Sequence, residues 1–297
     1  MRARILGSAA GGGFPQWNCR CPTCEAARTG TEARPRTQSS LAIRGADGPW
    51  LLVNASPDLR QQLEGLAGAR VDGVRAAPVA AVLLTDAEID HTAGLLLLRE
   101  SGTPIPVYGS DQVRRALTDG YPVLPILAHY SGVDWRTLEP GSSIPLDGSL
   151  EVESFAAGGD APRYLAGTGA EVEATGLVFR DRATGGVLTY VPGLARLDDG
   201  VVARFAASDL VLVDGTFWRD DELARLGISV RSARDMGHVP LSGPGGTLEA
   251  LAGLKRPRKA LVHINNTNPI LLEDSPERDE VLRAGVEVAY DGLEVEL

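Results

Sequence analysis

The segment Val82-Leu-Leu-Thr-Asp-Ala-Glu-Ile-Asp-His-Thr-Ala-Gly-Leu-Leu-Leu-Leu-Arg-Glu100 decides the fold of this chain. Residues 80–84 are apolar and predict a buried strand, and residues 95–98 predict a helix with one buried side directly after it. Four residues that can bind a metal lie between these two elements: Asp86, Glu88, Asp90 and His91. A short turn between rigid elements lets such side chains converge, so the segment predicts a metal site. Carboxylates also cap helices, and the segment alone leaves that alternative open.

Length and composition are those of an ordinary globular enzyme. The chain has 297 residues, a formal net charge of -10 and a pI near 5.0, which suits one large α/β domain or two small ones. There is no basic stripe for a phosphate backbone, which argues against nucleic acid as a partner. No apolar run reaches membrane-spanning length, and no signal peptide is recognisable after Met1. We expect a single cytoplasmic domain over residues 1–297, with no membrane partner.

All three cysteines lie close together, at Cys19, Cys21 and Cys24. A C-x-C-x-x-C cluster supplies most of a tetrahedral structural zinc site from one loop, at a low cost in ordering. So compact a set does not suit a disulfide framework, and it predicts a zinc-binding loop at about residues 18–25, called the cysteine clip below. The alternative is three free thiols without a metal.

Other apolar stretches predict a chain rich in strands. We expect strands at residues 2–7, 39–44, 50–54, 105–108, 150–156, 176–180, 186–191, 210–218 and 259–263. The second and third of these form a hairpin with its turn at 45–49. We expect helices that start within 54–58 and end at Leu66, and at 112–117 and 198–206. Pro and Gly are frequent in residues 121–141, which predicts an ordered loop around His129.

Two predicted strands end in residues that can bind a metal. Asp214 stands where one of them ends, and His263 stands at the end of the next. A third candidate, His238, lies in the tight loop Met236–Ser242. Each has a structural alternative, because Asp before Gly is commonly a turn residue and a loop His commonly bonds to carbonyl groups.

Potential ligands at three strand exits, Asp90 and His91, then Asp214, then His263, resemble the metallo-β-lactamase superfamily. The resemblance implies an αββα sandwich of two mixed sheets flanked by helices, with metal bound between the sheet edges. On the superfamily signature H-x-H-x-D-H, Asp86 and Glu88 replace the two leading histidines, and no histidine occurs in residues 155–164, where a third is expected. One metal site is therefore implied to be lost and one kept, with the ligands Asp90, His91, Asp214 and His263.

A closer resemblance, to the coenzyme PQQ synthesis protein B family, spans nearly the whole chain. Its recognisable segments are Gly11–Cys19, Asn54–Asp58, Asp90–Glu100, Val213–Trp218, Met236–Ser242 and His263–Leu271. The resemblance implies a role in the synthesis of pyrroloquinoline quinone (PQQ). The cysteine clip also resembles that of phosphodiesterase relatives in the superfamily, in which a downstream His completes the zinc site. That position is Asn266 here, so the fourth ligand stays open.

The resemblance implies a substrate: PQQ derives from a glutamate and a tyrosine of a precursor peptide, and the tyrosine ring must gain oxygens. A mixed nitrogen and oxygen site suits Fe(II) or Mn(II), and loss of the second metal suits two-metal hydrolysis poorly. We expect Fe(II) at the four-residue site and Zn(II) in the cysteine clip. The expected reaction is O2-dependent hydroxylation of the tyrosine ring of a Glu–Tyr precursor, with His238 as the acid and base.

The remaining candidate substrate contacts are Asn265, Asn266, Asn268, Trp218 and His129. Asp86 and Glu88 are candidate ligands for an extra metal, which would favour a metal-dependent hydrolase. A third alternative is a non-catalytic carrier that holds the finished quinone for export. Contacts with other proteins of the pathway, and a homodimer, stay open.

Overall fold

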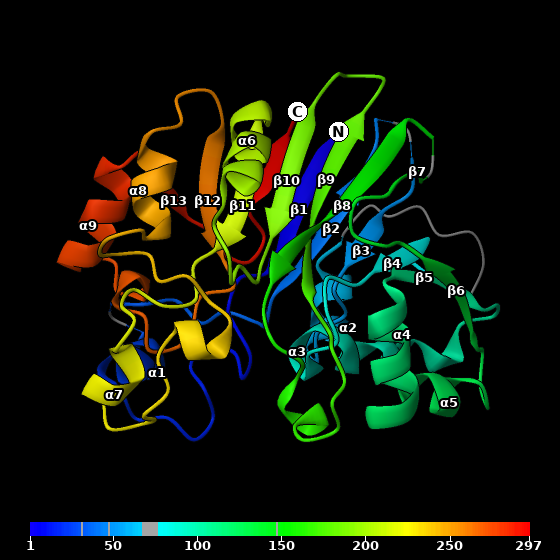
Figure 1. The fold of residues 1–297 in the computed structure, drawn as a ribbon, viewed down its shortest axis with the longest axis horizontal. Helices are drawn as coiled ribbons and strands as arrows, with labels where there is room; N and C mark the ends of the chain where they lie inside the picture. The colour runs from blue at the N-terminus through cyan, green and yellow to red at the C-terminus, as the bar shows by residue number, and fades with distance from the viewer. Residues whose placement is uncertain (31, 47, 67–76, 147) are drawn as a thin grey trace.

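The structure is a computed structural model, and it describes residues 1–30, 32–46, 48–66, 77–146 and 148–297. The described strands form two seven-stranded sheets that pack face to face, with helices on their outer faces (Figure 1). This is the αββα sandwich expected from the sequence. In the described ranges, no helix is both long enough and apolar enough to cross a membrane.

The first sheet has the strand order β14-β1-β2-β3-β4-β5-β6. Pairs from β14 to β3 are antiparallel, and pairs from β3 to β6 are parallel. The strands are β1 (Arg2–Gly7), β2 (Ser40–Arg44), β3 (Leu51–Val53), β4 (Ala81–Leu83), β5 (Ile105–Gly109), β6 (Val133–Thr137) and β14 (Glu294–Glu296). The predicted hairpin is confirmed as β2 and β3, although residue 47 of its turn lies outside the described residues.

The second sheet has the order β13-β12-β11-β10-β9-β8-β7. Its half from β10 to β13 is parallel, and its half from β7 to β10 is antiparallel. The strands are β7 (Ser143–Pro145), β8 (Leu150–Gly158), β9 (Ala174–Asp181), β10 (Val187–Val191), β11 (Leu210–Asp214), β12 (Arg258–Val262) and β13 (Glu287–Val288).

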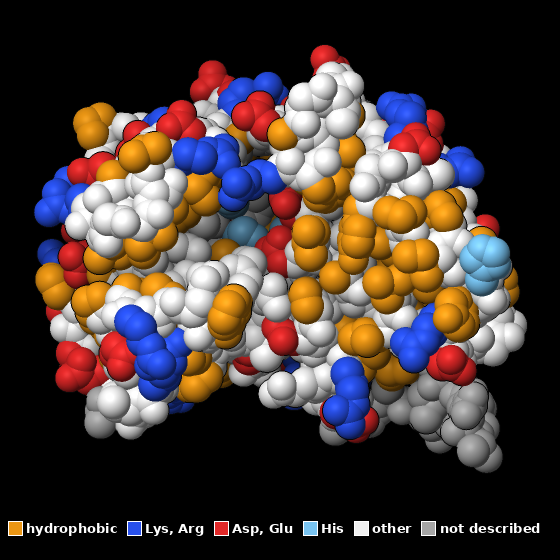
Figure 2. All heavy atoms as spheres, turned by 90° about the horizontal axis from the view of Figure 1, so that it is seen from below, with side chains coloured by type: hydrophobic (Ala, Val, Ile, Leu, Met, Phe, Trp, Pro, Cys, Tyr) orange, Lys and Arg blue, Asp and Glu red, His pale blue; other side chains and the backbone are white. Residues whose placement is uncertain are grey.

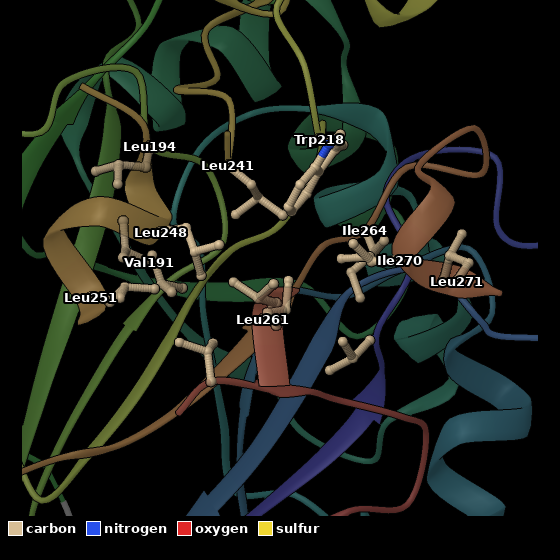
Figure 3. Packing of buried hydrophobic residues seen from close by; sticks show 14 of the residues in the cluster. Val191, Leu194, Trp218, Leu241, Leu248, Leu251, Leu261, Ile264, Ile270 and Leu271 are labelled. Atoms are coloured by element: carbon tan, nitrogen blue, oxygen red, sulfur yellow. The ribbon is translucent and has the colours of Figure 1, made fainter. Parts of the chain in front are cut away.

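The middle of the second sheet is buried on both faces, and β11 shows how its sequence achieves this. Leu210 and Leu212 belong to the core between the sheets, whereas Val211 and Val213 belong to the cluster under the outer helices. An uninterrupted apolar strand is therefore required here. Figure 3 shows part of the outer cluster, which includes Val191, Leu194, Leu241, Leu248, Leu251 and Leu261.

Short helices cover both sheets. Their bounds are α1 (Pro22–Thr29), α2 (Leu59–Glu64), α3 (Ile89–Thr92), α4 (Asp111–Arg115), α5 (Val123–Leu127), α6 (Asp199–Ala207), α7 (Glu222–Arg225), α8 (Thr247–Ala252) and α9 (Pro276–Arg283). Side-chain caps fix where several begin, because an accepting oxygen satisfies a free N–H of the first turn. The Asp198 carboxylate caps α6 and the Ser275 hydroxyl caps α9.

Two sequence expectations for local structure were wrong. Residues 121–141 are not one loop, since they contain α5 and β6; Val123 and Leu127, four residues apart, bury one side of a helix despite the neighbouring prolines. The helix expected after β4 is the short α3 followed by the 3-10 helix η1 (Ala93–Glu100). Gly94 lies tight against the segment between β3 and α2, and a Cβ on Gly94 would lie 2.2 Å from the Ser56 carbonyl oxygen.

Candidate metal centre

Loops at the carboxyl ends of β4, β11 and β12 meet at one edge of the sandwich. They bring together Asp90 and His91 from α3, Asp214 at the end of β11, and His263 directly after β12. Seen from below, histidine and acidic side chains lie in a hollow near the middle of the molecule (Figure 2). The site therefore takes residues from both sheets.

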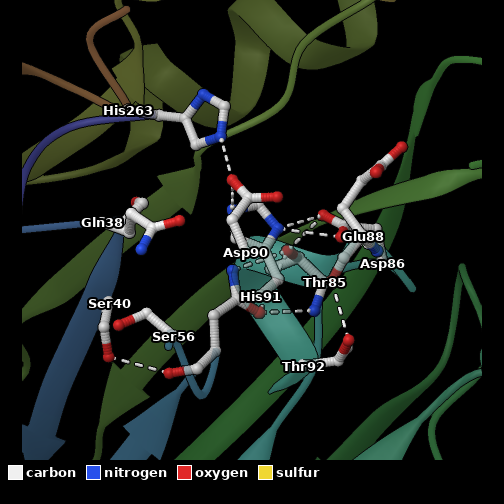
Figure 4. Close-up of polar contacts among 12 residues, drawn as sticks. Gln38, Ser40, Ser56, Thr85, Asp86, Glu88, Asp90, His91, Thr92 and His263 are labelled. Atoms are coloured by element: carbon white, nitrogen blue, oxygen red, sulfur yellow. Dashed lines mark hydrogen bonds and ion pairs between the residues drawn. The ribbon is translucent and has the colours of Figure 1, made fainter. Parts of the chain in front are cut away.

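Asp90, His91 and His263 form one cluster of potential metal ligands, with one donor atom of each within 4.8 Å of the others. His263 Nε2 lies 3.4 Å and His91 Nε2 lies 3.8 Å from Asp90 Oδ2 (Figure 4). His91 Nε2 is buried and has no hydrogen-bond partner among the described residues. A buried polar nitrogen without a partner is rare in proteins, and its position beside two other donors fits a metal ion.

Asp86 orients His91. The His91 Nδ1 atom lies 2.8 Å and 2.7 Å from the two carboxylate oxygens of Asp86. Those oxygens also accept hydrogen bonds from the Thr85 hydroxyl and the Glu88 backbone N–H. A carboxylate at Nδ1 leaves Nε2 as the ligand nitrogen and fixes the ring. Burial acts to lower the pKa of His91, but the charges of Asp86 and Asp90 outweigh it and raise this pKa to about 9.

Asp214 belongs to a second, overlapping cluster with His238 and His263. Its Oδ1 accepts from the backbone N–H and the hydroxyl of Thr216, at 2.8 and 2.6 Å. Its Oδ2 accepts from the Leu194 N–H at 2.9 Å and lies 2.6 Å from His238 Nδ1. Burial opposes ionisation of Asp214, yet the neighbouring His238 and His263 hold its pKa below the usual range. His263 is shared by both clusters, so the four expected ligands lie around one place.

His238 lies beside the shared histidine. Its ring stacks on that of His263, with centroids 5.4 Å apart, and Phe217 contacts it edge-on at 5.9 Å. Burial acts to lower the pKa of His238, but the Asp214 carboxylate outweighs this and raises it. Because Nδ1 is held by Asp214, Nε2 is the ring nitrogen left for proton transfer.

The clusters open into a cavity of about 280 Å³, called the histidine pocket. Its wall includes Glu88, Phe217 and Asn265, and two arginines, Arg163 and Arg231. A space of this size suits a small molecule rather than a polymer. Glu88 is exposed at the wall, where partial burial and the charges of Asp86 and Asp90 raise its pKa to about 7. Among the described residues, neither Asp86 nor Glu88 joins a converging donor cluster, so the geometry gives no support for an extra metal.

Four expected substrate contacts lie outside this pocket. His129 is exposed, in the turn after α5. Trp218 is buried in the outer core cluster, and its backbone N–H donates to the buried carboxylate of Glu222. Asn268 caps the 3-10 helix η5 (Pro269–Leu271) and donates to the Gly215 carbonyl. Asn266 is buried against the cysteine clip. Only Asn265 of this set lines the pocket.

The cysteine clip is a compact thiol cluster at the start of α1. The sulfur atoms of Cys19, Cys21 and Cys24 all lie within 4.8 Å of one another. Burial opposes ionisation of Cys21, but hydrogen bonds, first that of Thr23, leave its pKa below the usual range. Burial raises the pKa of Cys24 to about 11. A divalent metal would hold all three as thiolates, and this donor set fits zinc.

Sequence reasoning missed the residues that orient the ligands. The Thr216 hydroxyl lies 2.8 Å from His263 Nδ1 and bonds to Asp214, two residues before it. The sequence indicates Asp86 only as a possible ligand. Spacing in the sequence could have indicated these residues. A carboxylate or hydroxyl a few residues from a ligand histidine can reach the ring nitrogen that does not face the metal.

The fold and this site define a protein of the metallo-β-lactamase superfamily, and a family model described as "Beta-lactamase superfamily domain" matches residues 49–264. The chain belongs to the coenzyme PQQ synthesis protein B family. It is 50% identical to the protein of that name from Cupriavidus necator over 99% of both chains, and 47% identical to that from Pseudomonas putida over the whole of both.

Solved structures agree with this assignment. A crystal structure described as Zn(2+)-bound PqqB from Methylobacterium extorquens has a TM-score of 0.92 and 40% identity, and each chain is covered completely. A diphosphatase of the PhnP family has a TM-score of 0.70 at 19% identity, covering 100% of this chain and 98% of its own. That second likeness concerns the fold alone.

Proposed function

We propose that this protein acts in PQQ biosynthesis as an Fe(II)-dependent hydroxylase that uses O2 on the tyrosine ring of a Glu–Tyr-derived precursor. Family membership supports the pathway. The reaction is supported by one observation: Asp90, His91 and His263 converge at the pocket, with the His91 nitrogen buried and unpartnered. Two imidazoles and one carboxylate with open positions are the donor set of non-haem iron oxygenases.

The residues around this set have separate tasks. Bound iron would supply O2 activation, with one oxygen atom entering the ring, the other leaving as water, and two electrons coming from an external reductant. Asp86 and Thr216 orient the imidazoles of His91 and His263. Asp214 either completes the ligand set, as the sequence predicts, or holds His238 in place through its 2.6 Å contact.

His238 is the proposed acid and base, because its Nδ1 is tied to Asp214 and its ring lies beside the ligand His263. The Phe217 ring and Asn265 line the same pocket and are proposed to contact the substrate. The cavity of about 280 Å³ excludes most bulk water when a precursor fills it. Zn(II) is proposed for the cysteine clip, since three thiolates select a softer ion than the mixed site does.

The deciding experiment measures oxygen uptake and product mass with protein purified without air, loaded with Fe(II) and given a Glu–Tyr substrate and an excess of a two-electron reductant. Iron-dependent incorporation of one or two atoms from ¹⁸O2 would support the hydroxylase. His91→Ala should lose both bound iron and uptake, whereas His129→Ala, a histidine on the surface, should keep both. Unchanged iron content in His91→Ala would remove His91 as a ligand.

The same experiment separates the alternatives. Tight binding of PQQ without oxygen consumption would indicate the carrier. Two metals bound in the histidine pocket and cleavage of an ester or peptide would indicate the hydrolase.

A further inference from the structure

One short segment connects the cysteine clip to the histidine pocket. His263 contributes to the pocket, and Asn266, three residues later, is only 4% exposed and faces the clip. The amide nitrogen of Asn266 lies 3.2 Å from Cys24 Sγ and 3.8 Å from Cys21 Sγ. Among the described His, Cys, Asp and Glu side chains, only the three cysteines form this cluster. The fourth donor must therefore come from another residue type or from water.

The position of the Asn266 amide fits a metal ligand. In a tetrahedral zinc site, typical bond lengths of about 2.3 Å to sulfur and about 2.0 Å to oxygen put ligand sulfur and oxygen atoms roughly 3.5 Å apart. The observed 3.2 and 3.8 Å separations bracket that value. The two ends of an amide exchange places by a half-turn of its terminal bond. This half-turn brings the oxygen of Asn266 to the place where its nitrogen now meets the two sulfurs.

The backbone carbonyl of Asn266 is the competing donor. It already accepts a hydrogen bond of 2.5 Å from the Thr23 hydroxyl, and the sulfurs of Cys21 and Cys24 lie 3.7 and 3.9 Å from it. The side chain is nearer to Cys24 and has no such commitment to Thr23. We propose that the Asn266 side-chain oxygen is the fourth donor to the metal of the cysteine clip, and that this bond holds His263 in place.

The second half of the proposal follows from the backbone of His263. Its φ is +54°, in the left-handed region that costs a non-glycine residue energy unless neighbouring contacts enforce it. The Ile264 N–H donates to the Ser8 carbonyl, and the Asn265 N–H donates to the Thr216 carbonyl. Those bonds anchor one end of the segment, and Asn266 anchors the other. A metal in the clip therefore stabilises the conformation that places the His263 ring in the pocket.

Cobalt binding tests the first half without any measurement of activity. In a His91→Ala background, which weakens the pocket site, Co(II) reports on the clip through its thiolate charge-transfer and d–d bands. Asn266→Ala should lower clip affinity about 10- to 100-fold and shift the d–d bands as water replaces the amide. Asn266→His should restore the affinity and give a spectrum with a nitrogen donor. Asn18→Ala, an exposed asparagine beside Cys19, is the matched control and should match the wild type.

The results have distinct meanings. Unchanged affinity and bands in Asn266→Ala, in protein with an unaltered circular dichroism spectrum, would overturn the proposed ligand. If His91→Ala itself showed no thiolate-to-cobalt band, the cysteine clip would not bind a metal. These outcomes leave the proposed hydroxylase untouched, since it depends on oxygen uptake.

Iron affinity tests the second half. With His91 intact, Asn266→Ala should bind Fe(II) in the pocket several-fold more weakly than Asn18→Ala, and Asn266→His should recover most of the loss. Asn266→Ala could bind metal more weakly in the clip and still match Asn18→Ala in Fe(II) affinity. That result would show that the clip does not hold His263.

Discussion

At the scale of single residues, carboxylates set the orientation of the imidazoles. Asp86 contacts Nδ1 of His91, and Asp214 contacts Nδ1 of His238. In both pairs the carboxylate engages one ring nitrogen and leaves the other for a ligand or a proton. Asp86 stands where the superfamily signature H-x-H-x-D-H has its first histidine. The substitution exchanges a ligand for a residue that positions one.

Asp86→Asn should therefore lower metal affinity in the pocket about 10- to 100-fold, because the His91 ring loses the charged partner that fixes it. Glu88→Gln is the matched control, because Glu88 meets His91 through its backbone carbonyl, which accepts from the His91 N–H, and the variant changes only the side chain. Isothermal titration with Fe(II) or Co(II) measures both. An equal loss in Glu88→Gln would favour direct metal binding by these two acids instead.

Glu222 makes the free energy of unfolding depend on pH. It is 6% exposed and accepts hydrogen bonds from the Trp218 N–H and the Thr267 hydroxyl, and burial raises its pKa to about 7. Because the folded state holds this proton more tightly than the unfolded state, whose pKa is about 4.3, the free energy of unfolding falls as pH rises from about 4.3 to about 7. The loss amounts to at most about 4 kcal/mol.

Glu222→Gln should remove this loss. Urea unfolding of both proteins at pH 5 and pH 8 should show that the wild type loses more stability between the two values than the variant does. The comparison cancels the contributions of all other titrating groups. Identical pH dependence would mean that the Glu222 carboxyl ionises normally in the fold.

At the scale of elements, the site depends on the close approach of α3 and η1 to the chain after β3. The Ala55 N–H donates to the His91 carbonyl, and the Gly94 N–H donates to the Ala55 carbonyl. Gly94→Ala places a methyl group 2.2 Å from the Ser56 oxygen, so α3 must shift. We expect a loss of about 1–3 kcal/mol in stability, together with weaker metal binding.

Gly102→Ala is the control for that variant, since a Cβ there meets no atom within 4 Å. Thermal unfolding and metal titration of both variants make the comparison. If Gly94→Ala matched Gly102→Ala in both, the packing of η1 would not set the position of His91.

Many of the strands and helices could be predicted from the sequence. Uninterrupted apolar runs such as Leu210–Val213 predict buried strands, and ligands at their ends predict a shared edge. The sequence was insufficient where long-range contacts decide. Nothing local in residues 121–141 distinguishes β6 from a loop, because β6 forms by pairing with β5. Likewise the placement of Asn266 on the clip and of Asn268 under Gly215 depends on contacts more than 50 residues away in sequence.

At the scale of the whole molecule, stability resides in the layer between the two sheets. Phe179 on β9 is fully buried there, among residues of both sheets. Phe179→Ala should lower the free energy of unfolding by about 3–5 kcal/mol, since it removes a large buried ring and leaves a cavity. Ile126→Ala, at a 43% exposed position, should change it by less than about 0.5 kcal/mol. Denaturant unfolding measures both variants. If Phe179→Ala lost as little stability as Ile126→Ala, the layer between the sheets would not be the main source of stability.

The proposed ligands come from both halves of the sandwich, and this has a consequence for how the chain acquires its metal. Asp90 and His91 follow a strand of the first sheet, whereas His263 follows β12 of the second, near the end of the sequence. A ribosome-bound chain that has not yet released β12 holds no complete binding site. Metal capture is then a late step of maturation, and a captured ion acts as a cross-link that closes a loop of most of the chain. The nascent chain therefore cannot hold the pocket metal before His263 has left the ribosome.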